Sequence, residues 1–518
     1  MKKILVLLLA LMLLVLVACE PSETNSNNNA NNNSNNNSNN NSNSSNINGD
    51  IVLNEDENGE IIPVGNTANI MQPLKGGFDN EAEALRTKIL NAKDNLEISG
   101  TTYYVSSKNG NDDNDGLTKE TAWKSFEGIT LNSYLFEEGD AVLFERGGVY
   151  RQASTWYIQS GLTIGAYGEG EKPKIYGSQL NYAQSGLWEP SNKKFVWKLN
   201  LTTLDAGIIV FNHGEAIGSK KDGLLELEEN GDFYHNVNDS LLYLYLDKGY
   251  PDVIYNDIEI GTKGNMLFLA DKAKDVVIDN ICLKYGGSHA IGTTTHASNV
   301  RITNCEIGWI GGSYQDEEKN PGVRYGNGIQ FWDSTSDAVI DNNWVYQCYD
   351  TGITFQGQGP KSVYKNLKFT NNLVEYCTYS FEYWDSQTEG NIKQNIIMEN
   401  NISRFAGYGW GPNDRPENTY TSHIFFGSTT PNGISNFTIK NNIFDLNAYS
   451  VIYWSQRNGE KIYDGISISN NSYYQRVNDI NRVCGFNGKY NSANNKNDFI
   501  EALKFFDKSP KQVIFDTK

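Results

Sequence analysis

The sequence predicts an all-β solenoid, a chain wound into repeated coils of short strands. The first observation is a repeat, between positions 279 and 474, in which asparagine precedes a short apolar strand. Its first asparagines are 24 to 41 residues apart, most often 29, a period typical of solenoids. The second is composition, since 48 Gly and 12% aromatic residues accompany only 12 Pro. The repeats begin at Asn280, Asn304, Asn342, Asn371, Asn400, Asn441 and Asn470.

The overall charge narrows the class of partner. The 518 residues carry a net charge of −19 and a pI of about 4.8. Such an acidic chain would repel phosphate backbones and anionic membrane surfaces. We therefore expect no nucleic-acid partner, and we expect the protein to be a monomer.

The N-terminus has the features of an export signal. Lys2 and Lys3 precede the apolar run Ile4–Val17, which is too short to be preferred as a membrane span. The small residue before Cys19 resembles the lipobox of bacterial lipoproteins. That resemblance implies cleavage before Cys19, lipid on its sulfur, and an extracytoplasmic protein facing the cell exterior. The membrane contact would be the lipid anchor alone; a plain secretory signal is the alternative.

The domain organisation follows from shifts in composition. Residues between Thr24 and Asn48 are almost wholly Asn and Ser, which cannot form a core and predict a disordered tether. Short helices are expected over Asn80–Leu96 and Asp498–Phe506, capping the two ends of the solenoid. The predicted parts are 1–19 signal peptide with lipobox, 20–50 tether, 51–100 segment with capping helix, 101–180 first solenoid part, 181–265 antiparallel β insertion, 266–485 main solenoid and 486–518 C-terminal cap.

Five cysteines remain after the lipidated one. Cys348 and Cys377 both lie six residues after the first asparagine of their repeats, so they should stack in neighbouring coils. We favour two buried thiols, and a disulfide between them is the alternative in an exported protein. None of the cysteines shows the close pairing of a zinc site.

Three segments of the first solenoid part carry a family resemblance. They read YYVSSKNGNDDNDG from Tyr103, GDAVLFERGGVYR from Gly139 and IGAYGEGEKPKIYG from Ile164. The chain resembles the secreted right-handed parallel β-helix proteins of the pectate-lyase-like superfamily over residues 100–180 and, through the asparagine repeats, 275–475. The resemblance implies that fold and carbohydrate chemistry. It leaves the reaction open, because the superfamily includes lyases, glycosidases, epimerases and binding proteins.

The second strand of each repeat predicts a face for substrate. The strands are aligned by their first apolar residue, giving an inward row of Ile291, Ile329, Ile353, Phe381, Ile424 and Val451. Alternation sends the following side chains outward. The two outward rows are Gln330, Thr354, Glu382 and Phe425, then Trp332, Gln356, Trp384, Gly427 and Trp454. Tryptophans beside a few polar groups suit sugar rings, although a satellite core under long loops is the alternative.

Two long insertions, Gly311–Tyr325 and Tyr408–Thr421, precede strands of this face and are expected to fold over it. His289 occupies the start of an equivalent strand. The predicted substrate-binding residues are Gln330, Trp332, Asp333, Gln356, Trp384, Tyr408, Trp410, His289 and Trp454.

Glu382 is the first candidate for catalysis, because an outward carboxyl among aromatic rings should have a raised pKa, as a general acid needs. Glycoside hydrolysis requires a second carboxyl, for which we select Asp350, with a turn-capping role as its alternative. His423 is a candidate base, orienting group or substrate ligand. Arg415 is a candidate ligand for a hydroxyl or carboxylate, or the partner of Asp414 in a structural ion pair.

The sequence therefore predicts a surface-anchored enzyme that cleaves glycosidic bonds of a polysaccharide or oligosaccharide. Hydrolysis is favoured, with no cofactor or metal. The main alternative is a polysaccharide lyase acting on a uronate polymer, in which Ca²⁺ is possible. The second alternative is a carbohydrate-binding surface protein without catalysis. The residues do not distinguish which glycan is cleaved, with which stereochemistry, or from which position in the chain.

Overall fold

The structure is a computed structural model, and the residues that it describes lie within Val52–Lys518. They are residues 74–293, 295–316, 320–357, 361–385, 390–415, 420–427, 433–454, 464–476, 482–486 and 489–516. The signal peptide, Cys19 and the tether lie outside them. Within these ranges, no helix combines the length and apolar character needed to cross a membrane.

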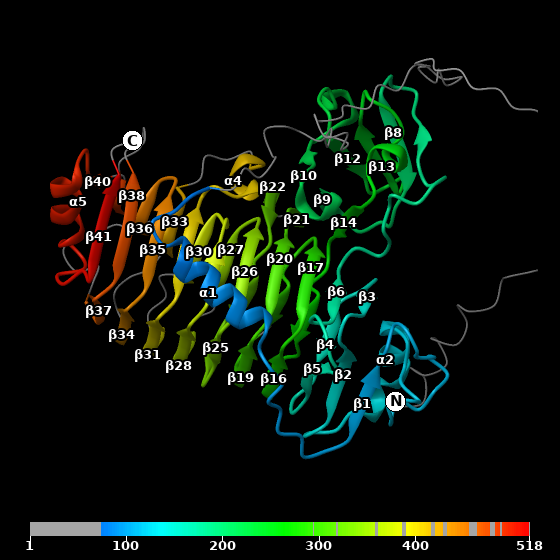
Figure 1. Cartoon of the computed structure of the whole chain (residues 1–518), viewed down its shortest axis with the longest axis horizontal. Helices are drawn as coiled ribbons and strands as arrows, with labels where there is room; N and C mark the ends of the chain where they lie inside the picture. The colour runs from blue at the N-terminus through cyan, green and yellow to red at the C-terminus, as the bar shows by residue number, and fades with distance from the viewer. Residues whose placement is uncertain are drawn as a thin grey trace, which may run out of the picture. The chain divides into compact units, whose positions relative to one another are not determined.

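Three long sheets form the body of the protein (Figure 1). Each coil contributes one strand to each sheet, as β16 (Lys274–Asp279), β17 (Cys282–Gly286) and β18 (Ile291–Thr293) do in turn. Apart from an antiparallel pair at the C-terminal end of the third sheet, the strands pair in parallel with their equivalents in the next coil, for example β16 with β19 (Ala297–Thr303). This pairing is that of a parallel β-helix, and the predicted fold is confirmed.

The strands of the first sheet are β1 (Thr102–Val105), β2 (Ala141–Glu145), β5 (Thr163–Tyr167), β16, β19, β24 (Thr335–Ser336), β25 (Val339–Asp341), β28 (Val363–Thr370), β31 (Ile392–Glu399), β34 (Ile434–Lys440) and β37 (Ile466–Ser469). The second sheet contains β3 (Val149–Arg151), β6 (Lys174–Tyr176), β17, β20 (Glu306–Ile310), β26 (Trp344–Cys348), β29 (Leu373–Glu375), β32 (Ile402–Ala406), β35 (Ile443–Asn447), β38 (Ser472–Arg476) and β41 (Gln512–Asp516). The third sheet contains β4 (Trp156–Ile158), β15 (Leu267–Leu269), β18, β23 (Ile329–Trp332), β27 (Thr351–Gly357), β30 (Tyr379–Asp385), β33 (Ser422–Gly427), β36 (Ser450–Trp454), β39 (Arg482–Phe486) and β40 (Lys489–Ser492).

The asparagine repeat has a structural cause at the turn between the first and second sheets. The first asparagine of each repeat adopts a positive φ, 57° at Asn342 for example, which asparagine tolerates better than most residues. The second asparagine points inward and joins a buried ladder. The side chain of Asn372 donates to that of Asn401 at 2.9 Å, and Asn401 donates to Asn442 at 3.0 Å. Each asparagine thus satisfies buried polar groups of the neighbouring coil.

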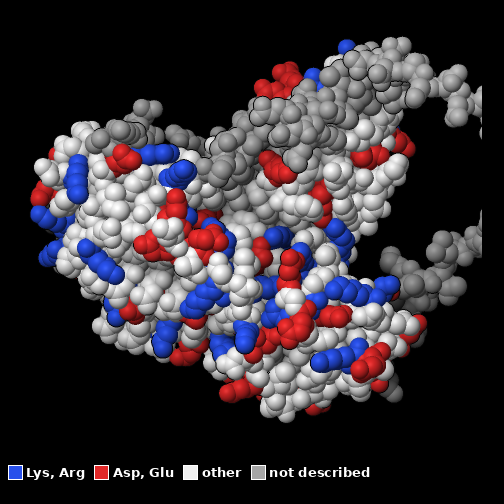
Figure 2. All heavy atoms as spheres, in the orientation of Figure 1, with Lys and Arg blue, Asp and Glu red and all other residues white. Residues whose placement is uncertain are grey.

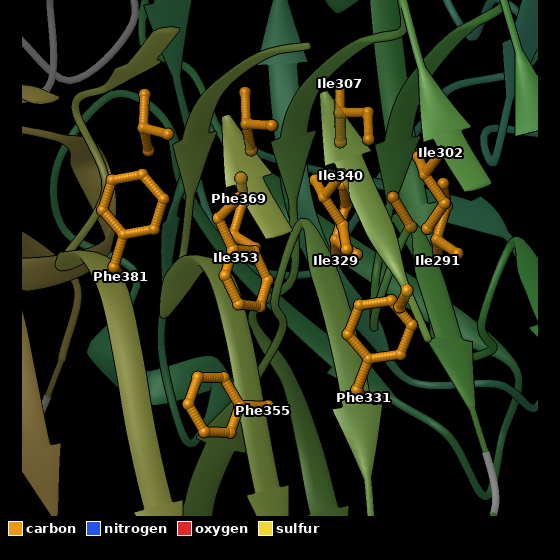
Figure 3. Close-up of a cluster of buried hydrophobic side chains, with 14 of the residues drawn as sticks. Ile291, Ile302, Ile307, Ile329, Phe331, Ile340, Ile353, Phe355, Phe369 and Phe381 are labelled. Atoms are coloured by element: carbon orange, nitrogen blue, oxygen red, sulfur yellow. The ribbon is translucent and has the colours of Figure 1, made fainter. Parts of the chain in front are cut away.

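The core consists of side chains stacked from coil to coil (Figure 3). Ile291, Ile329, Ile353 and Phe381 form one such stack, in the predicted register. Cys348 and Cys377 are buried free thiols, and the register of β26 and β29 places them in equivalent positions of adjacent coils. The predicted pair of stacked thiols is confirmed.

The predicted antiparallel insertion separates β6 from β15 and contains two small sheets. Apart from one parallel pair, β11 with β12, its strands pair antiparallel. Its strands are β7 (Glu189–Pro190), β8 (Val196–Asn200), β9 (Ala206–Phe211), β10 (Ala216–Ile217), β11 (Ser219–Lys220), β12 (Asp232–Asn236), β13 (Leu241–Tyr245) and β14 (Ile258–Thr262). A separate hairpin, β21 (Ser313–Asp316) and β22 (Asn320–Tyr325), forms within the first long insertion of the main solenoid.

The helices are short. They are α1 (Asp79–Leu90), α2 (Phe126–Asn132), α3 (Pro251–Ile254), α4 (Trp410–Asn413) and α5 (Lys496–Leu503), with single turns η2 (Ser133–Leu135), η3 (Asn212–Gly214) and η4 (Leu224–Glu226). At the C-terminal end of the β-helix, α5 buries Phe499 and Leu503 in the core, as expected for a cap.

The prediction that the first helix caps an end is wrong. α1 lies along the outside of the second sheet, where Ala82 and Ile89 pack on Leu373 and Ile402 (Figure 1). Its Arg86 pairs with the buried carboxylate of Glu375 at 2.8 Å. On the face shown in Figure 2, acidic and basic side chains are interspersed. At the N-terminal end of the β-helix, α2 supplies the capping contacts instead of α1, because Phe126 of α2 joins the core.

Candidate functional site

The outer face of the third sheet carries three rows of side chains in register. The central row contains Gly292, Gln330, Thr354, Glu382, Phe425 and Tyr453, and the tryptophan row contains Trp332, Gln356, Trp384 and Gly427. An upstream row, three residues before the central one, contains His289, Asn327, Thr351 and Tyr379. The predicted rows are confirmed in every strand except the last, β36.

That last strand is misaligned in the prediction. Ile424 pairs with Ile452, and Phe426 pairs with Trp454. A shift of one residue turns each side chain to the other face of a strand. Trp454 is therefore fully buried and stacks on Phe426 at 4.2 Å, while Tyr453 points outward. The substrate-binding assignment of Trp454 is wrong.

Glu382 is buried and held by the neighbouring strand. Its Oε2 accepts hydrogen bonds from Thr351 Oγ1 at 2.9 Å, from Thr354 Oγ1 at 3.2 Å and from the amide of Gln356. Burial, with the charge of Asp350 as the second cause, raises the pKa of Glu382 to about 8, although the three hydrogen bonds oppose this shift. Glu382 thus holds its proton at neutral pH.

Asp350 stands one strand away at the start of β27 and is ion-paired. Its Oδ1 lies 3.2 Å from the guanidinium of Arg415, whose side chain is nearly buried and lies over the ring of Tyr349. The hydroxyl of Tyr379 is in the field of the same groups, since Arg415, Asp350 and Glu382 all influence its pKa, which burial raises strongly. An anionic carboxylate and a protonated one therefore face the same small region.

The loop that carries Arg415 is fastened to the insertion. Asp414 accepts a hydrogen bond from Ser219 Oγ at 2.9 Å and pairs with the buried Arg324 at 2.8 Å. Arg324 also donates to the backbone carbonyls of Gly312 and Gly207, at 2.6 and 3.2 Å. One buried guanidinium therefore joins the insertion, the first long loop and the Arg415 loop.

The upstream row continues as a hydrogen-bonded polar strip. Nδ1 of His289 accepts from the backbone N–H of Asn327 at 3.0 Å, and the side chain of Asn327 donates to Gln330 at 2.6 Å. Burial lowers the pKa of His289 to about 3, so its ring is neutral with the proton on Nε2. Tyr325 of the first long loop packs edge-on against His289 at 5.0 Å. His289 is thereby fixed as a hydrogen-bond donor.

The tryptophan row is partly open to solvent. Trp332 and Trp384 are half-buried, and Gln356 lies between them. Gly427 leaves room for the indole of Trp384, because a Cβ at this glycine would lie 2.2 Å from the ring. Asp333 follows Trp332 in a turn with φ of 52° and accepts from Ser362 Oγ at 2.7 Å. These placements leave Trp332 and Trp384 available to a ligand and tie Asp333 to the turn.

Three further predicted site residues lie elsewhere. His423 points into the core, where its Nδ1 contacts Ser403 Oγ at 2.6 Å and burial lowers its pKa to about 3. Trp410 is buried against Tyr349 and donates to the carbonyl of Gln347. Tyr408 packs on the cluster beside the start of α1, outside the second sheet. The catalytic assignment of His423 and the binding assignments of Trp410 and Tyr408 are therefore wrong.

Thr351, Tyr379 and Asn327 belong to the site and were missed by the sequence alignment. The alignment began at the first apolar residue of each strand, whereas the upstream row precedes it by two residues. Tyr379 stacks on Phe425 at 4.4 Å, and Phe425 stacks on Tyr453 at 5.6 Å, which makes an aromatic wall on the C-terminal side of Glu382. A polar or aromatic residue recurring two positions before the strand apolar residue was the available signal.

Comparison with known proteins found similar segments and similar folds. No family model matches it. A lacto-N-biosidase of Bifidobacterium longum subsp. longum is 34% identical over 99 residues, which are 18% of this chain and only 6% of that protein's length. Similar solved structures include a glycoside hydrolase, with a TM-score of 0.42 and 8% identity over 81% of this chain and 96% of that one. A lacto-N-biosidase from Eubacterium ramulus has a TM-score of 0.32 and 14% identity over 85% of this chain and 70% of that one.

Proposed function

We propose that this protein is a glycoside hydrolase that cleaves a polysaccharide or oligosaccharide outside the cytoplasm, with Glu382 as general acid and Asp350 as the second carboxylate. The observation that carries the proposal is the pair itself, a buried carboxyl whose pKa is raised to about 8 beside an ion-paired aspartate. The pairing of one protonated and one ionised carboxyl is the requirement of glycosidic hydrolysis. The similarity of 99 residues to an enzyme named lacto-N-biosidase supports a sugar substrate.

The roles of the two carboxyl groups follow from their hydrogen bonds and ion pairs. Oε2 of Glu382 accepts hydrogen bonds from three donors, so we assign the acid proton to Oε1. Oε1 donates this proton to the glycosidic oxygen as the bond to the anomeric carbon breaks. Asp350, kept ionised by Arg415, activates water or attacks the anomeric carbon from the other side. Trp332, Trp384 and Tyr379 provide ring faces for the sugars, and His289, Gln330 and Gln356 bind their hydroxyls.

The location is part of the proposal and is supported by the sequence alone. The charged and apolar start of the chain, with Cys19 after a small residue, predicts export and a lipid anchor. Extraction with detergent, and labelling by a radioactive fatty acid that is lost in Cys19→Ser, would test it. A Cys19→Ser protein that remains membrane-bound would contradict the anchor.

The reaction is tested with a panel of glycans and two variants. Glu382→Gln keeps the shape of the side chain and removes the acid, so release of reducing ends should fall by about 10³-fold or more. Glu399→Gln, on the first sheet, is the matched control and should retain wild-type activity. Products with the ultraviolet absorbance of an unsaturated uronate would instead establish a lyase. Glycan binding that is equal in wild type and Glu382→Gln, without product from either, would establish a binding protein.

A lyase needs a cation beside the uronate, and two arginines that could supply it are engaged elsewhere. Arg324 is fully buried against Asp414, and Arg404 pairs with Glu375 and Asp445 beneath α1 on the second sheet. Arg415 is left near Glu382, where it is engaged by Asp350. These contacts favour hydrolysis over elimination in the proposal, and the product assay separates the two.

A further inference from the structure

The outer face of the third sheet extends well beyond Glu382 toward the N-terminus. The central row continues from Gln330 through Gly292 and Phe268 to Tyr157, each paired in register with the next. The sheet order from β4 to β30 contains five strand steps, which at ~4.8 Å each amount to about 24 Å. Tyr157 and Glu382 therefore stand on one continuous face, far enough apart for separate sugar residues.

The N-terminal end of this row is an aromatic platform. Tyr157 is 62% exposed, and its ring meets that of Phe268 edge-on at 6.0 Å. The ring of Phe268 lies over Gly292, where an added Cβ would be 2.8 Å from two ring atoms. The glycine thus allows the phenyl ring to lie against the sheet, next to His289. Exposed aromatic faces in this arrangement suit the apolar faces of sugar rings.

A cavity of about 610 Å³ opens beside Tyr157, between β4 and α2. Its volume lies in the range of sites for small ligands. Leu131 and Phe126 contribute apolar walls, while Gln152, Arg151 and Thr155 contribute polar groups. The cavity therefore combines ring surfaces with hydrogen-bonding groups.

Gln152 is an independent indication of a ligand. The residue is 5% exposed, and its amide donates to the carbonyl of Met266 at 2.7 Å. Its Oε1 is buried and lacks a hydrogen-bond partner among the described residues. Buried acceptors are normally satisfied, so this oxygen has the capacity to accept from a hydroxyl donor. Gln152 lines both this cavity and a smaller one that reaches Asn265, the residue whose side chain accepts from the backbone N–H of His289.

We propose that this cavity, with Tyr157, Phe268 and Gln152, is a distal sugar-binding subsite for the glycan chain that Glu382 cleaves. The proposal rests on the proposed function of Glu382, and it adds that the substrate is an extended chain of about five or more sugars, one for each ~4.8 Å strand spacing. A neutral chain fits the platform, because the Arg151 guanidinium at its edge is already paired with Glu259 at 2.7 Å. The distal subsite would hold the chain while hydrolysis proceeds at Glu382.

The test compares short and long substrates. Tyr157→Ala should lower kcat/KM on chains of more than about five sugars by about tenfold, through KM, and leave di- and trisaccharide derivatives unchanged, because the short ones cannot span ~24 Å. Phe268→Ala should have the same length-dependent effect. Tyr134→Ala is the matched control: this tyrosine is 79% exposed, does not line the cavity, and should be neutral with both substrates. An equal loss on short and long chains, or no loss on long ones, would overturn the subsite.

Failure of the proposed function is recognised separately. If the wild type cleaves no glycan, Glu382 is not a hydrolase acid, and the subsite is then tested by equilibrium binding of long glycans from the panel. Weaker binding by Tyr157→Ala than by Tyr134→Ala would still support the subsite. Equal binding by wild type, Tyr157→Ala and Tyr134→Ala would refute it.

Discussion

Replacing Glu382 by Gln should change how the stability of the protein depends on pH. The side chain keeps its shape and can still accept from Thr351, Thr354 and Gln356, but it can no longer ionise. In the wild type, burial and the charge of Asp350 raise the pKa of Glu382 to about 8 in the folded state. The pKa of an unfolded glutamate is ~4.3.

The sign and size of the effect of pH on stability follow from the difference between these two pKa values. Below pH ~4 Glu382 is protonated in both the folded and the unfolded state, and its contribution to the free energy of unfolding is fully present. As pH rises, the unfolded state ionises first, so the wild type loses about 1.4 kcal/mol per pH unit until the folded pKa of about 8 is passed. Between pH 5 and 8 the wild type should therefore lose about 2–4 kcal/mol relative to Glu382→Gln. The same proton sets the activity, which should fall as pH rises through about 8.

The assay is urea unfolding followed by tryptophan fluorescence at several pH values. Glu375→Gln is the matched control, because Glu375 is an equally buried carboxylate that accepts from Arg86 and Trp344 at 2.8 and 2.9 Å. Its replacement removes the negative charge that pairs with Arg86 and Arg404, and it should destabilise the protein by about 3–5 kcal/mol at neutral pH. A stability difference between wild type and Glu382→Gln that does not change with pH would refute the raised pKa and, with it, the general-acid assignment.

Three further changes test the site and the scaffold. Asp350→Asn removes the charge that helps to raise the pKa of Glu382, so the alkaline loss of stability should end at a lower pH; an unchanged profile would show that the two carboxyls do not interact. Asn401→Leu interrupts the buried asparagine ladder and should lower the free energy of unfolding, measured in urea, by about 2–4 kcal/mol. An unchanged free energy of unfolding would show that the ladder does not stabilise the fold. Trp454→Ala removes a fully buried side chain and should lower the free energy of unfolding by about 3–5 kcal/mol. Trp384→Ala removes a half-buried side chain, so it should lower that free energy by less than half as much and should instead weaken substrate binding. Similar losses of stability from both variants would contradict the register.

Much of the scaffold was predictable because solenoids repeat. The asparagine spacing located the coils, and strand alternation placed Ile329, Ile353 and Phe381 inside and Glu382 outside. The same reasoning was wrong at β36, where two apolar residues, Val451 and Ile452, follow each other and either can begin an alignment. Only hydrogen bonding with β33 selects Ile452, because backbone pairing depends on neighbours rather than on local hydrophobicity.

The first helix shows the same limit. Its apolar face was visible in the sequence, but a face alone does not say which surface will cover it. Pairing of Arg86 with Glu375, 289 residues away, and packing of Ile89 near Ile402 place it on the second sheet instead of at an end.

The sequence by itself determined the class of fold, the face on which Glu382 stands and the kind of chemistry to look for, because these depend on periodic patterns within short segments. Only the tertiary structure decided the chemical state of the site. The proton on Glu382 depends on burial and on Asp350, and Arg415 reaches Asp350 through a loop whose Asp414 is bound by Arg324 and Ser219. These interactions join residues 32 to 195 positions apart. Electrostatic and hydrogen-bond energies depend on distance and burial, and neither is encoded in the spacing of residues along a chain.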